Sequence, residues 1–293
     1  MQTKLQKHIE STITQYLEEY YEIGQVSSVA GGSINDAYKI RGANGSDFFV
    51  KVNSKSRYPQ MFEKEKRGLE LLAAANAIAI PQVIAVDSLD DSAFLILEFI
   101  PQGTETPRFW NDLGTQLANL HRHTDESFGL DEDNYIGSLH QSNRRHDRWG
   151  EFFAQERLAP LARQAFDSGL LNQKDLDTFE KLYSRLDEIF PEEPPALLHG
   201  DLWSGNYYCG VGDIPFLIDP AVYYGHREMD IAMTRMFGGF ALGFYQAYHE
   251  QNPLAPGWES RISLANIYPS LVHVVLFGSS YLSSVREPIR QFY

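Results

Sequence analysis

The chain has 293 residues, with 25 lysines and arginines against 39 aspartates and glutamates, so its formal net charge is −14 at pH 7 when histidine is neutral. Binding to nucleic acid phosphates or anionic lipids needs positive charge, so this balance argues against DNA, RNA and membranes as partners. Hydrophobic residues make up 43% of the chain and charged residues 22%, which is ordinary for a folded globular protein. The length allows one large domain or two smaller ones.

Cys209 is the only cysteine, so the chain cannot form an intramolecular disulfide or a cysteine-based zinc site. This favours a reducing compartment, and we expect a cytoplasmic protein. Residues 1–22 place apolar side chains at every fourth position, which predicts an amphipathic helix rather than a signal peptide. The longest segment without charge, residues 262–285 with histidine counted as neutral, is too polar to span a membrane.

The first hundred residues alternate short β-prone segments with turn residues, a pattern that predicts an antiparallel sheet with two helices. Glycine, asparagine and serine separate the early strands, and three aspartates separate the last two. The expected elements are a helix within 1–22, strands at 26–32, 37–41 and 47–52, a helix at 59–77, and strands at 83–86 and 93–100.

Beyond Pro101 helical patterns replace most of the β-prone segments. We therefore expect a boundary near this proline, with an N-terminal lobe at residues 1–100 and a larger, mainly helical C-terminal lobe at residues 101–293. The expected helices lie at 109–123, 149–168, 174–190 and from 229 onward, and short apolar segments lie at 196–198, 207–209 and 216–218.

The most informative segment is His-Gly-Asp-Leu-Trp-Ser-Gly-Asn at residues 199–206. Asp201 and Asn206 are 5 residues apart, and Asp219 follows Asp201 by 18 residues across a predicted hairpin. Phosphoryl transfer needs one carboxylate to orient the attacking hydroxyl and accept its proton, and a carboxylate and an amide to bind magnesium. We therefore assign Asp201 as the catalytic base and Asn206 and Asp219 as the magnesium ligands.

Each of these motifs alone is more often an ordinary turn, but further features stand in the order that a kinase needs. They are a Gly-Gly-Ser-Ile-Asn turn at residues 31–35, a strand lysine, Lys51, an acid on the following helix, and an apolar strand that ends at residues 97–101. Their common order makes coincidence improbable, and the sequence predicts a kinase.

Two glutamates compete as the partner of the strand lysine. Glu63 and Glu65 lie about 200° apart on the predicted helix, so only one of them can face the site. We favour Glu65, because Leu69 and Leu72 follow it at helical spacing and place it beside the apolar face of the helix.

These motifs resemble those of the protein-kinase-like small-molecule kinases, a group that includes aminoglycoside phosphotransferases and choline kinases. The broad resemblance rests on Lys51, Glu65, Asp201, Asn206 and Asp219. Longer strings resemble, more narrowly, the fructosamine kinase family, also called ketosamine-3-kinases, and cover nearly the whole chain. These strings are Gly-Gly-Ser-Ile-Asn-Asp-Ala at 31–37, the 199–206 segment, and Asp-Pro-Ala-Val-Tyr-Tyr-Gly-His-Arg-Glu-Met-Asp-Ile-Ala-Met at 219–233, which runs into Met-Phe-Gly-Gly-Phe at 236–240.

The resemblance implies an α+β, two-lobed protein-kinase-like fold, with a five-stranded antiparallel sheet plus a helix in the N-terminal lobe, a mainly helical C-terminal lobe, and ATP between them. It implies that Lys51 binds the α and β phosphates and is held by Glu65, that the glycine turn covers the phosphates, and that the end of the last strand pairs with adenine. The implied nucleotide-binding residues are Gly31, Gly32, Ser33, Lys51, Glu65, Glu98, Phe99 and Ile100.

For the acceptor, the resemblance implies a ketoamine of the ribulosamine or fructosamine type, phosphorylated on the third carbon of its sugar so that deglycation follows. Trp203 and His273 resemble substrate-binding residues of the family, although on physical grounds either side chain could equally belong to the core. Ser33 replaces a cysteine of some relatives, so we expect a monomer and no thiol switch at this turn.

The string at 225–230 contains residue types that often catalyse, but we assign it other roles. In kinase-like folds an acid at this point braces the catalytic loop by accepting its backbone N–H groups, and we expect this of Asp230. His226 and Arg227 are expected to shape the wall of the pocket and not to catalyse.

Two alternatives remain open. A kinase of this fold could act on another amino sugar or amino alcohol, such as an aminoglycoside or choline, although Trp203 and the string at 224–228 fit ketosamine kinases better. A nucleotide-binding pseudokinase that serves as a scaffold is the second alternative, and the intact lysine, aspartates and asparagine argue against it.

Overall fold

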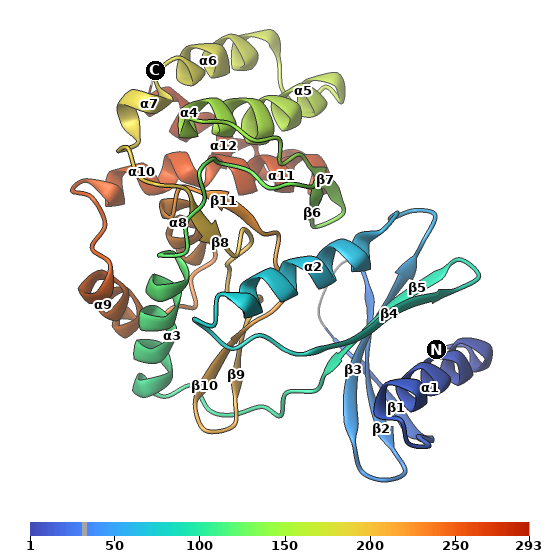
Figure 1. The fold of residues 1–293 in the computed structure, drawn as a ribbon. Coiled ribbons are helices and arrows are strands. Elements are labelled where there is room, and N and C mark those ends of the chain that lie inside the picture. Colours follow the sequence, from blue (N-terminus) through green and yellow to red (C-terminus); the bar gives the residue numbers. More distant parts are fainter. Residues whose placement is uncertain (31–33, 293) are drawn as a thin grey trace.

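The computed structural model describes residues 1–30 and 34–292. Its first part is a five-stranded antiparallel sheet in the order β1-β2-β3-β5-β4, with a helix on each face (Figure 1). The elements are α1 (Thr3–Leu17), β1 (Ile23–Val29), β2 (Asp36–Gly42), β3 (Asp47–Ser54), α2 (Met61–Ala74), β4 (Val83–Leu89) and β5 (Ser92–Glu98). The number, order and kind of elements predicted for this part are thus confirmed, with boundaries shifted by a few residues.

β5 is apolar along most of its length because helices cover both faces of the sheet. Side chains of a strand alternate between its two faces. Phe94 and Ile96 accordingly pack with Ile9 of α1, whereas Leu95 packs with Leu69 of α2. The four-residue apolar spacing of the first helix is the face that α1 buries on the sheet.

The remainder of the chain is mainly helical (Figure 1). Its helices are α3 (Pro107–Leu120), α4 (Trp149–Phe152), the π-helical turn η1 (Phe153–Leu158), α5 (Ala159–Asp167), α6 (Gln173–Tyr183), α7 (Leu186–Ile189), α8 (Glu228–Met236), α9 (Leu242–Gln251), α10 (Trp258–Ala265), α11 (Ile267–Phe277), the 3-10 turn η2 (Ser279–Tyr281) and α12 (Leu282–Gln291). Its strands are β6 (Asn134–Ile136), β7 (Leu139–Gln141), β8 (Ala196–Leu198), β9 (Tyr207–Gly210), β10 (Ile214–Leu217) and β11 (Tyr223–Gly225).

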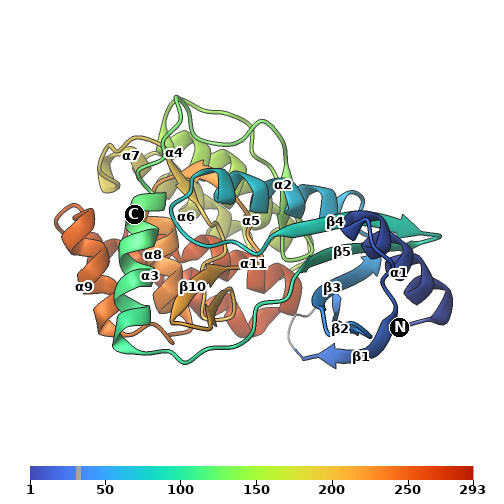
Figure 2. The ribbon, with the colours of Figure 1, turned by 60° about the horizontal axis from the view of Figure 1, so that its bottom comes forward.

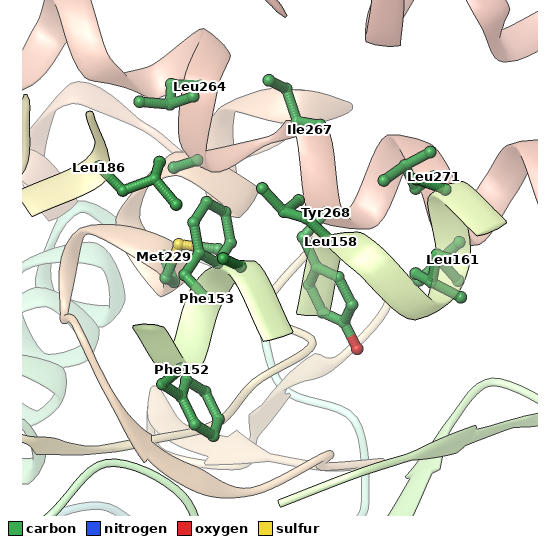
Figure 3. Packing of buried hydrophobic residues seen from close by; sticks show 14 of the residues in the cluster. Phe152, Phe153, Leu158, Leu161, Leu186, Met229, Leu264, Ile267, Tyr268 and Leu271 are labelled. Carbon is green, nitrogen blue, oxygen red and sulfur yellow. The ribbon is translucent and has the colours of Figure 1, made fainter. Parts of the chain in front are cut away.

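The largest apolar cluster of this part lies where α4, η1 and α5 pack on α11. Phe152, Phe153, Leu158, Tyr268 and Leu271 all belong to this cluster (Figure 3). All five side chains are buried, so the cluster forms a close-packed core of the helical part.

The sequence predicts one helix at 149–168, and the structure divides it into α4, η1 and α5. A π turn widens the helix locally and changes which side chains face inward. Arg157 lies in this turn and is fully buried, and its guanidinium lies 4.1 Å from the ring centre of Tyr223 and 4.5 Å from that of Phe152. The helix predicted at 174–190 is likewise divided, into α6 and α7.

Two short strand pairs were not predicted as pairs. β6 pairs with β7 in a hairpin, and β8 pairs with β11. Each of these strands has three residues, which is too short to show a period in the sequence.

A linker joins the two parts and runs from β5 to α3 along one side of the molecule (Figure 2). The N–H group of Gly103 donates to the carbonyl of Cys209 at 2.8 Å, and Gln102 forms a β bridge with Gly210. A Cβ atom on Gly103 would lie 2.1 Å from the carbonyl oxygen of Gly210, so only glycine permits this approach. Phe99 and Ile100, predicted as the end of the last strand, belong to this linker.

No helix among residues 1–30 and 34–292 combines the length and the apolar character that crossing a bilayer requires.

The close packing of α3 on α9 gives a stability prediction. A Cβ atom on Gly114 would lie 2.2 Å from the backbone oxygen of Phe244, and backbone cannot move aside as a flexible side chain can. We expect Gly114→Ala to lower the free energy of unfolding by about 1–3 kcal/mol in urea denaturation. Gly24→Ala is the control, because its new Cβ would lie 3.5 Å from the nearest atoms. Equal stability of the two variants would contradict the predicted clash.

Candidate active site

A cleft of about 840 Å³ is lined by residues from the sheet, from α2 and from the helical part. Every predicted site residue that the structure describes lines this one cleft. These residues are Lys51, Glu65, Glu98, Phe99, Ile100, Asp201, Trp203, Asn206, Asp219 and His273. The predicted phosphate-covering residues Gly31, Gly32 and Ser33 lie outside the described residues.

Lys51 is the buried cation of the cleft. In the sheet it pairs with Leu95, whose side chain packs against α2, so Lys51 also points to the α2 side. Its Nζ atom donates to Oε1 of Glu65 at 2.6 Å and to Oδ1 of Asp219 at 2.5 Å. Glu65, rather than Glu63, is therefore the helix acid that meets the lysine, as the helical spacing favoured.

The two carboxylates keep this lysine charged. Burial by itself lowers the pKa of Lys51, but the attraction and hydrogen bonds of Asp219 and Glu65 overcome it, and the pKa lies above its ordinary value. The lysine is thus a fixed positive charge within the cleft.

Asp219 enters the cleft through an unusual backbone conformation. Its φ of 56° lies in the left-handed region, which aspartate tolerates better than most residues. The chain turns there, so the N–H of Ala221 donates to the carbonyl of His199 at 2.9 Å and β11 joins β8. This turn brings the segment that carries Asp219 beside the segment that carries Asp201.

The carboxylate of Asp230 holds the loop at 199–201 through hydrogen bonds to its backbone. The two oxygens of this fully buried carboxylate accept the N–H groups of His199 at 2.8 Å and Gly200 at 2.9 Å, and Oδ2 also contacts His121 at 3.2 Å. Burial alone would raise the pKa of Asp230, but His121 and the N–H of Gly200 hold it below its ordinary value. The bracing contacts predicted for Asp230 are confirmed.

His199 fixes the loop from the other side. Its Nδ1 accepts the N–H of Asp201 at 3.2 Å, so its Nε2 carries the hydrogen and donates to the carbonyl of Ile218 at 2.9 Å. Burial lowers the pKa of His199, which agrees with this neutral ring. The histidine therefore joins the two loops that carry Asp201 and Asp219.

Asp201 and Asn206 are in direct contact. The amide nitrogen of Asn206 donates to the backbone oxygen of Asp201 at 2.8 Å and to its Oδ2 at 2.9 Å. Burial raises the pKa of Asp201 to about 7; the Asn206 hydrogen bond opposes this rise, and the charges of Asp219 and Asp230 add to it. A carboxylate with this pKa accepts a proton near neutral pH.

These hydrogen bonds also determine which oxygen atoms remain available to bind a cation. Because Asn206 donates through its nitrogen, its amide oxygen remains as a ligand atom, and Asp219 has one carboxylate oxygen that does not bind Lys51. Hard oxygen ligands of this kind fit Mg²⁺. Over the part of the chain that the structure describes, no cluster of three or more His, Cys, Asp or Glu side chains could hold a metal by itself. The pair therefore suits a cation that also binds phosphate oxygens and water.

The linker end of the cleft holds the predicted adenine-binding residues. The N–H of Glu98 already donates to the carbonyl of Gln82 at 2.9 Å, so this group is not free for a base. The ring of Phe99 lies under Lys39, with Nζ 3.8 Å from the ring centre. Any backbone pairing at this end must therefore use other groups of residues 98–100.

The opposite end of the cleft has an aromatic wall, which we define as Trp203, Phe237, His273 and Phe277. Trp203 is 38% exposed and meets the ring of Phe237 edge-on at 5.8 Å between centres, so it is not a core plug. The ring centres of Phe237 and Phe277 lie 5.3 and 5.5 Å from the ring centre of His273. Nδ1 of His273 donates to the carbonyl of Pro269 at 2.7 Å, which fixes its ring plane.

Sequence reasoning missed Phe237 and Phe277 as cleft residues. Their exposure of 47% and 52% is unusual for phenylalanine, but exposure is not visible in a sequence. The one available signal was the position of Phe237 within the family-like string at 236–240.

His226 and Arg227 do not shape the cleft wall, which corrects the prediction for them. Neither residue lines the cleft. Arg227 forms two hydrogen bonds with the carboxylate of Glu193, at 2.7 and 2.9 Å, and His226 contacts the carbonyl of Pro191 at 3.2 Å. Both side chains are turned into the helical part, because Asp230 and the start of α8 take the side that faces the catalytic loop.

A sequence model of the family described as fructosamine kinase matches residues 5–293. A protein of Vibrio parahaemolyticus named "Probable ketoamine kinase" is 37% identical over 273 residues, which cover 92% of this chain and 93% of that protein. The chloroplastic protein-ribulosamine 3-kinase of Oryza sativa subsp. japonica is 37% identical over 277 residues, which cover 92% of this chain and 79% of that protein.

Solved structures show the same likeness. A structure described as a fructosamine-3-kinase from Thermobifida fusca superposes with a TM-score of 0.86 at 35% identity and covers 96% of this chain and 97% of that one. Amicoumacin kinase, solved with AMP-PNP and Ca²⁺, has a TM-score of 0.59 at 13% identity over 100% of this chain and 96% of that one, a likeness of fold alone. The predicted two-lobed, kinase-like α+β fold is confirmed.

The bracing of the catalytic loop gives a prediction with a defined pH dependence. Replacing Asp230 by asparagine leaves a loop N–H without an acceptor, and we expect the variant to be about 1–3 kcal/mol less stable at pH 7. The folded-state pKa of Asp230 lies below the unfolded value of about 3.9, so its stabilisation is complete above that pH and fades as the pH falls toward the folded pKa. The stability gap should therefore narrow below about pH 4 in urea denaturation at several pH values.

Asp131→Asn is the matched control, since this carboxylate is 88% exposed and pairs only with Arg145 among the described contacts. It should change the free energy of unfolding by no more than about 0.5 kcal/mol. A gap for Asp230→Asn that is the same at pH 7 and pH 3 would contradict the assignment.

Proposed function

The chain belongs to the fructosamine kinase family, and on this premise we propose that it transfers the γ-phosphoryl group of ATP to the hydroxyl on the third carbon of a ketoamine. As a member of this family the protein is a phosphotransferase that acts on a hydroxyl group. The proposal adds the donor, the position and the acceptor, which is of the ribulosamine or fructosamine type and either free or bound to protein. Such 3-phosphates are unstable and release the amine, so the reaction would serve deglycation.

One arrangement carries the proposal. A buried lysine between two carboxylates and a hydrogen-bonded Asp201–Asn206 pair line the same cleft. Phosphoryl transfer depends mainly on positioning and on neutralising phosphate charge, and these groups supply both. We assign the nucleotide mainly to residues 1–100 and the acceptor to residues 101–293.

The charged residues divide the work between the phosphates and the attacking hydroxyl. Lys51 neutralises phosphate charge at a position that Glu65 fixes. Asp201 orients the acceptor hydroxyl and takes its proton, and the bond from Asn206 holds the carboxylate in one orientation. Asn206 and Asp219 would hold Mg²⁺, which supplies Lewis-acid stabilisation of the phosphate oxygens when bound.

The lining of the acceptor end favours a ketoamine over an aminoglycoside. The aromatic wall is joined in the cleft by further apolar side chains of the helical part, which are Met233, Met236, Pro269, Val272 and Leu276. A polycationic aminoglycoside needs several carboxylates, and none is present in this set. A single protonated amine beside an apolar substituent suits aromatic faces, which attract cations weakly and bury apolar surface.

The decisive experiment measures ATP consumption with a ribulosamine, a fructosamine, an aminoglycoside and choline in turn, with magnesium present. We expect steady turnover with the ketoamines and background consumption with the other two acceptors and without acceptor. Turnover with an aminoglycoside or choline alone would assign the chain to the first alternative. Nucleotide binding without turnover on any acceptor would support the scaffold.

Asp201→Asn tests the catalytic base. Asparagine keeps the size of the side chain but cannot accept the proton, so kcat should fall by about 10²- to 10⁴-fold while the affinity for ATP is nearly unchanged. Steady-state kinetics with a ketoamine and nucleotide titration measure the two effects. Retained turnover would remove Asp201 from this role.

Trp203→Leu tests the acceptor end. Loss of the indole face should raise the KM for the ketoamine by about 3- to 30-fold and leave the KM for ATP unchanged, because aromatic and cation–π contacts contribute about 0.5–2 kcal/mol. Trp258→Leu is the control, since Trp258 does not line the cleft. An equal rise in the KM for ATP would show that Trp203 does not belong to the acceptor end.

A further inference from the structure

We propose, on the basis of the function above, that residues 131–143 form a positioning element for phosphoryl transfer, with Asn134 as its central residue. This segment, called the bridge from here on, contains β6 and β7. It holds α2, which carries Glu65, in a fixed relation to the segment that carries Asp219.

The bridge contacts α2 through polar groups. The guanidinium of Arg67 donates to both carboxylate oxygens of Glu132, and Lys64 donates to a backbone carbonyl of the bridge. The hydroxyl of Tyr135 donates to the carbonyl of Pro59, just before α2 begins, at 3.0 Å. β6 lies beside α2, and β7 pairs with β6 on the side away from the helix (Figure 1). Helix α2 is therefore fastened to the helical part as well as to the sheet.

The other side of the bridge is fastened to the chain that follows Asp219. The amide nitrogen of Asn134 donates to the carbonyl of Val222 at 2.8 Å, and that of Gln141 donates to the carbonyl of Ala221 at 3.1 Å. Gln141 and Asn143 also donate to the amide oxygen of Asn134, at 2.7 and 3.0 Å. Asn134, Gln141 and Asn143 are all buried, so each of these bonds is shielded from water.

Arg157 and Tyr268 fix the direction of this network. Arg157 donates to the amide oxygen of Asn143 at 2.6 Å, and the hydroxyl of Tyr268 donates to that of Gln141 at 2.5 Å. A guanidinium can only donate, and the backbone carbonyls at the other end can only accept, so each amide between them has one orientation. Nε of Arg157 has no partner among the described residues, but the amides of Asn134, Gln141 and Asn143 each donate through nitrogen and accept through oxygen, and this pairing specifies one geometry for them.

Close packing completes the bridge. A Cβ atom on Gly68 of α2 would lie 3.2 Å from Val222, whose carbonyl also accepts the bond from Asn134. The helix thus lies directly on the segment between β10 and β11 that the bridge holds. Lys51 then joins Glu65 of the helix to Asp219 of this segment.

This placement bears on catalysis because the lysine needs both partners at once. A shift of α2 away from the segment between β10 and β11 would draw Glu65 and Asp219 apart and misplace the cation. Misplacement by about 1 Å can cost on the order of 10²-fold in rate. Asn134 and Tyr135 also line the cleft. We assign them to positioning because their side chains hydrogen-bond to the chain just before α2 and to the segment after Asp219.

The first test uses the exposed contacts, whose loss should leave the protein folded. In the double variant Arg67→Met, Tyr135→Phe we expect faster hydrogen exchange of the α2 amides. We also expect a fall in kcat of about three- to tenfold, with the KM for the ketoamine unchanged, since such contacts are individually weak. Arg163→Met, the same change in an exposed ion pair of α5, is the control and should alter neither quantity.

The second test asks whether the bridge acts through Glu65. In a Glu65→Gln background the double variant should cause no further loss of kcat, because groups that act as a unit are not additive. A loss as large as in the wild-type background would overturn the proposal. Asn134→Ala should lower kcat by about ten- to hundredfold through its buried unpaired groups, and a folded Asn134→Ala enzyme with wild-type kcat would also overturn it.

The exchange measurement separates this proposal from the proposed function, because it requires no substrate. Unchanged exchange of α2 in both bridge variants overturns the role of the bridge whatever the acceptor is. Absence of turnover in the wild-type protein with every ketoamine overturns the proposed reaction. Hydrogen exchange of the α2 amides would still show whether the bridge holds this helix in place.

Discussion

The ammonium group of Lys51 is the constraint on which the site depends. Lys51 is 4% exposed. Removing such a cation from water is costly unless groups of opposite charge replace the lost hydration. The replacement comes from α2 and from the segment after β10, which are far apart in the sequence. The lysine is therefore stable in its place only when sheet, helix and catalytic segment keep theirs, and the same condition places a positive charge in an acidic protein where phosphate would bind.

Other buried charges surround the catalytic loop and are compensated in a different way. Arg227 and Arg261 each form two hydrogen bonds with one carboxylate, that of Glu193 or of Glu228, and Asp230 accepts backbone N–H groups. These closed pairs leave no charge directed at the cleft. The titratable residues at 226–230 thus stabilise the structure around the catalytic loop. Their residue types suggest catalysis only when their partners are not known.

Much of the fold and of the candidate site was predictable because its signals are local. The spacing of apolar residues in α1 and β5, and the intervals from Asp201 to Asn206 and Asp219, reflect one helix face, one strand or one hairpin at a time. The choice of Glu65 over Glu63 followed from helix geometry together with the apolar spacing of Leu69 and Leu72, and the structure bears it out.

The parts that could not be predicted depend on contacts between distant segments. The amides of β6 and β7 look like loop residues in the sequence, because their partners are backbone carbonyls about 80 residues away. The π turn that contains Arg157 has no periodic signature, and the ring contact between Phe237 and His273 of α11 joins segments that are distant in the sequence. Roles for individual residues beyond these contacts remain proposals.

The linker after β5 has a mechanical consequence. The chain passes once between the sheet and the helical part, and pairing of Gln102 and Gly103 with the β9–β10 hairpin anchors it to the helical part almost at once. Pro101 has a fixed φ, so few free torsion angles remain between Glu98 and that anchor. Any rotation of one part against the other must bend this linker, where we propose that the adenine binds, and must also disturb the contacts between α2 and the bridge. A nucleotide bound at the linker would restrict this bending, so occupancy of the cleft would affect the angle between the parts.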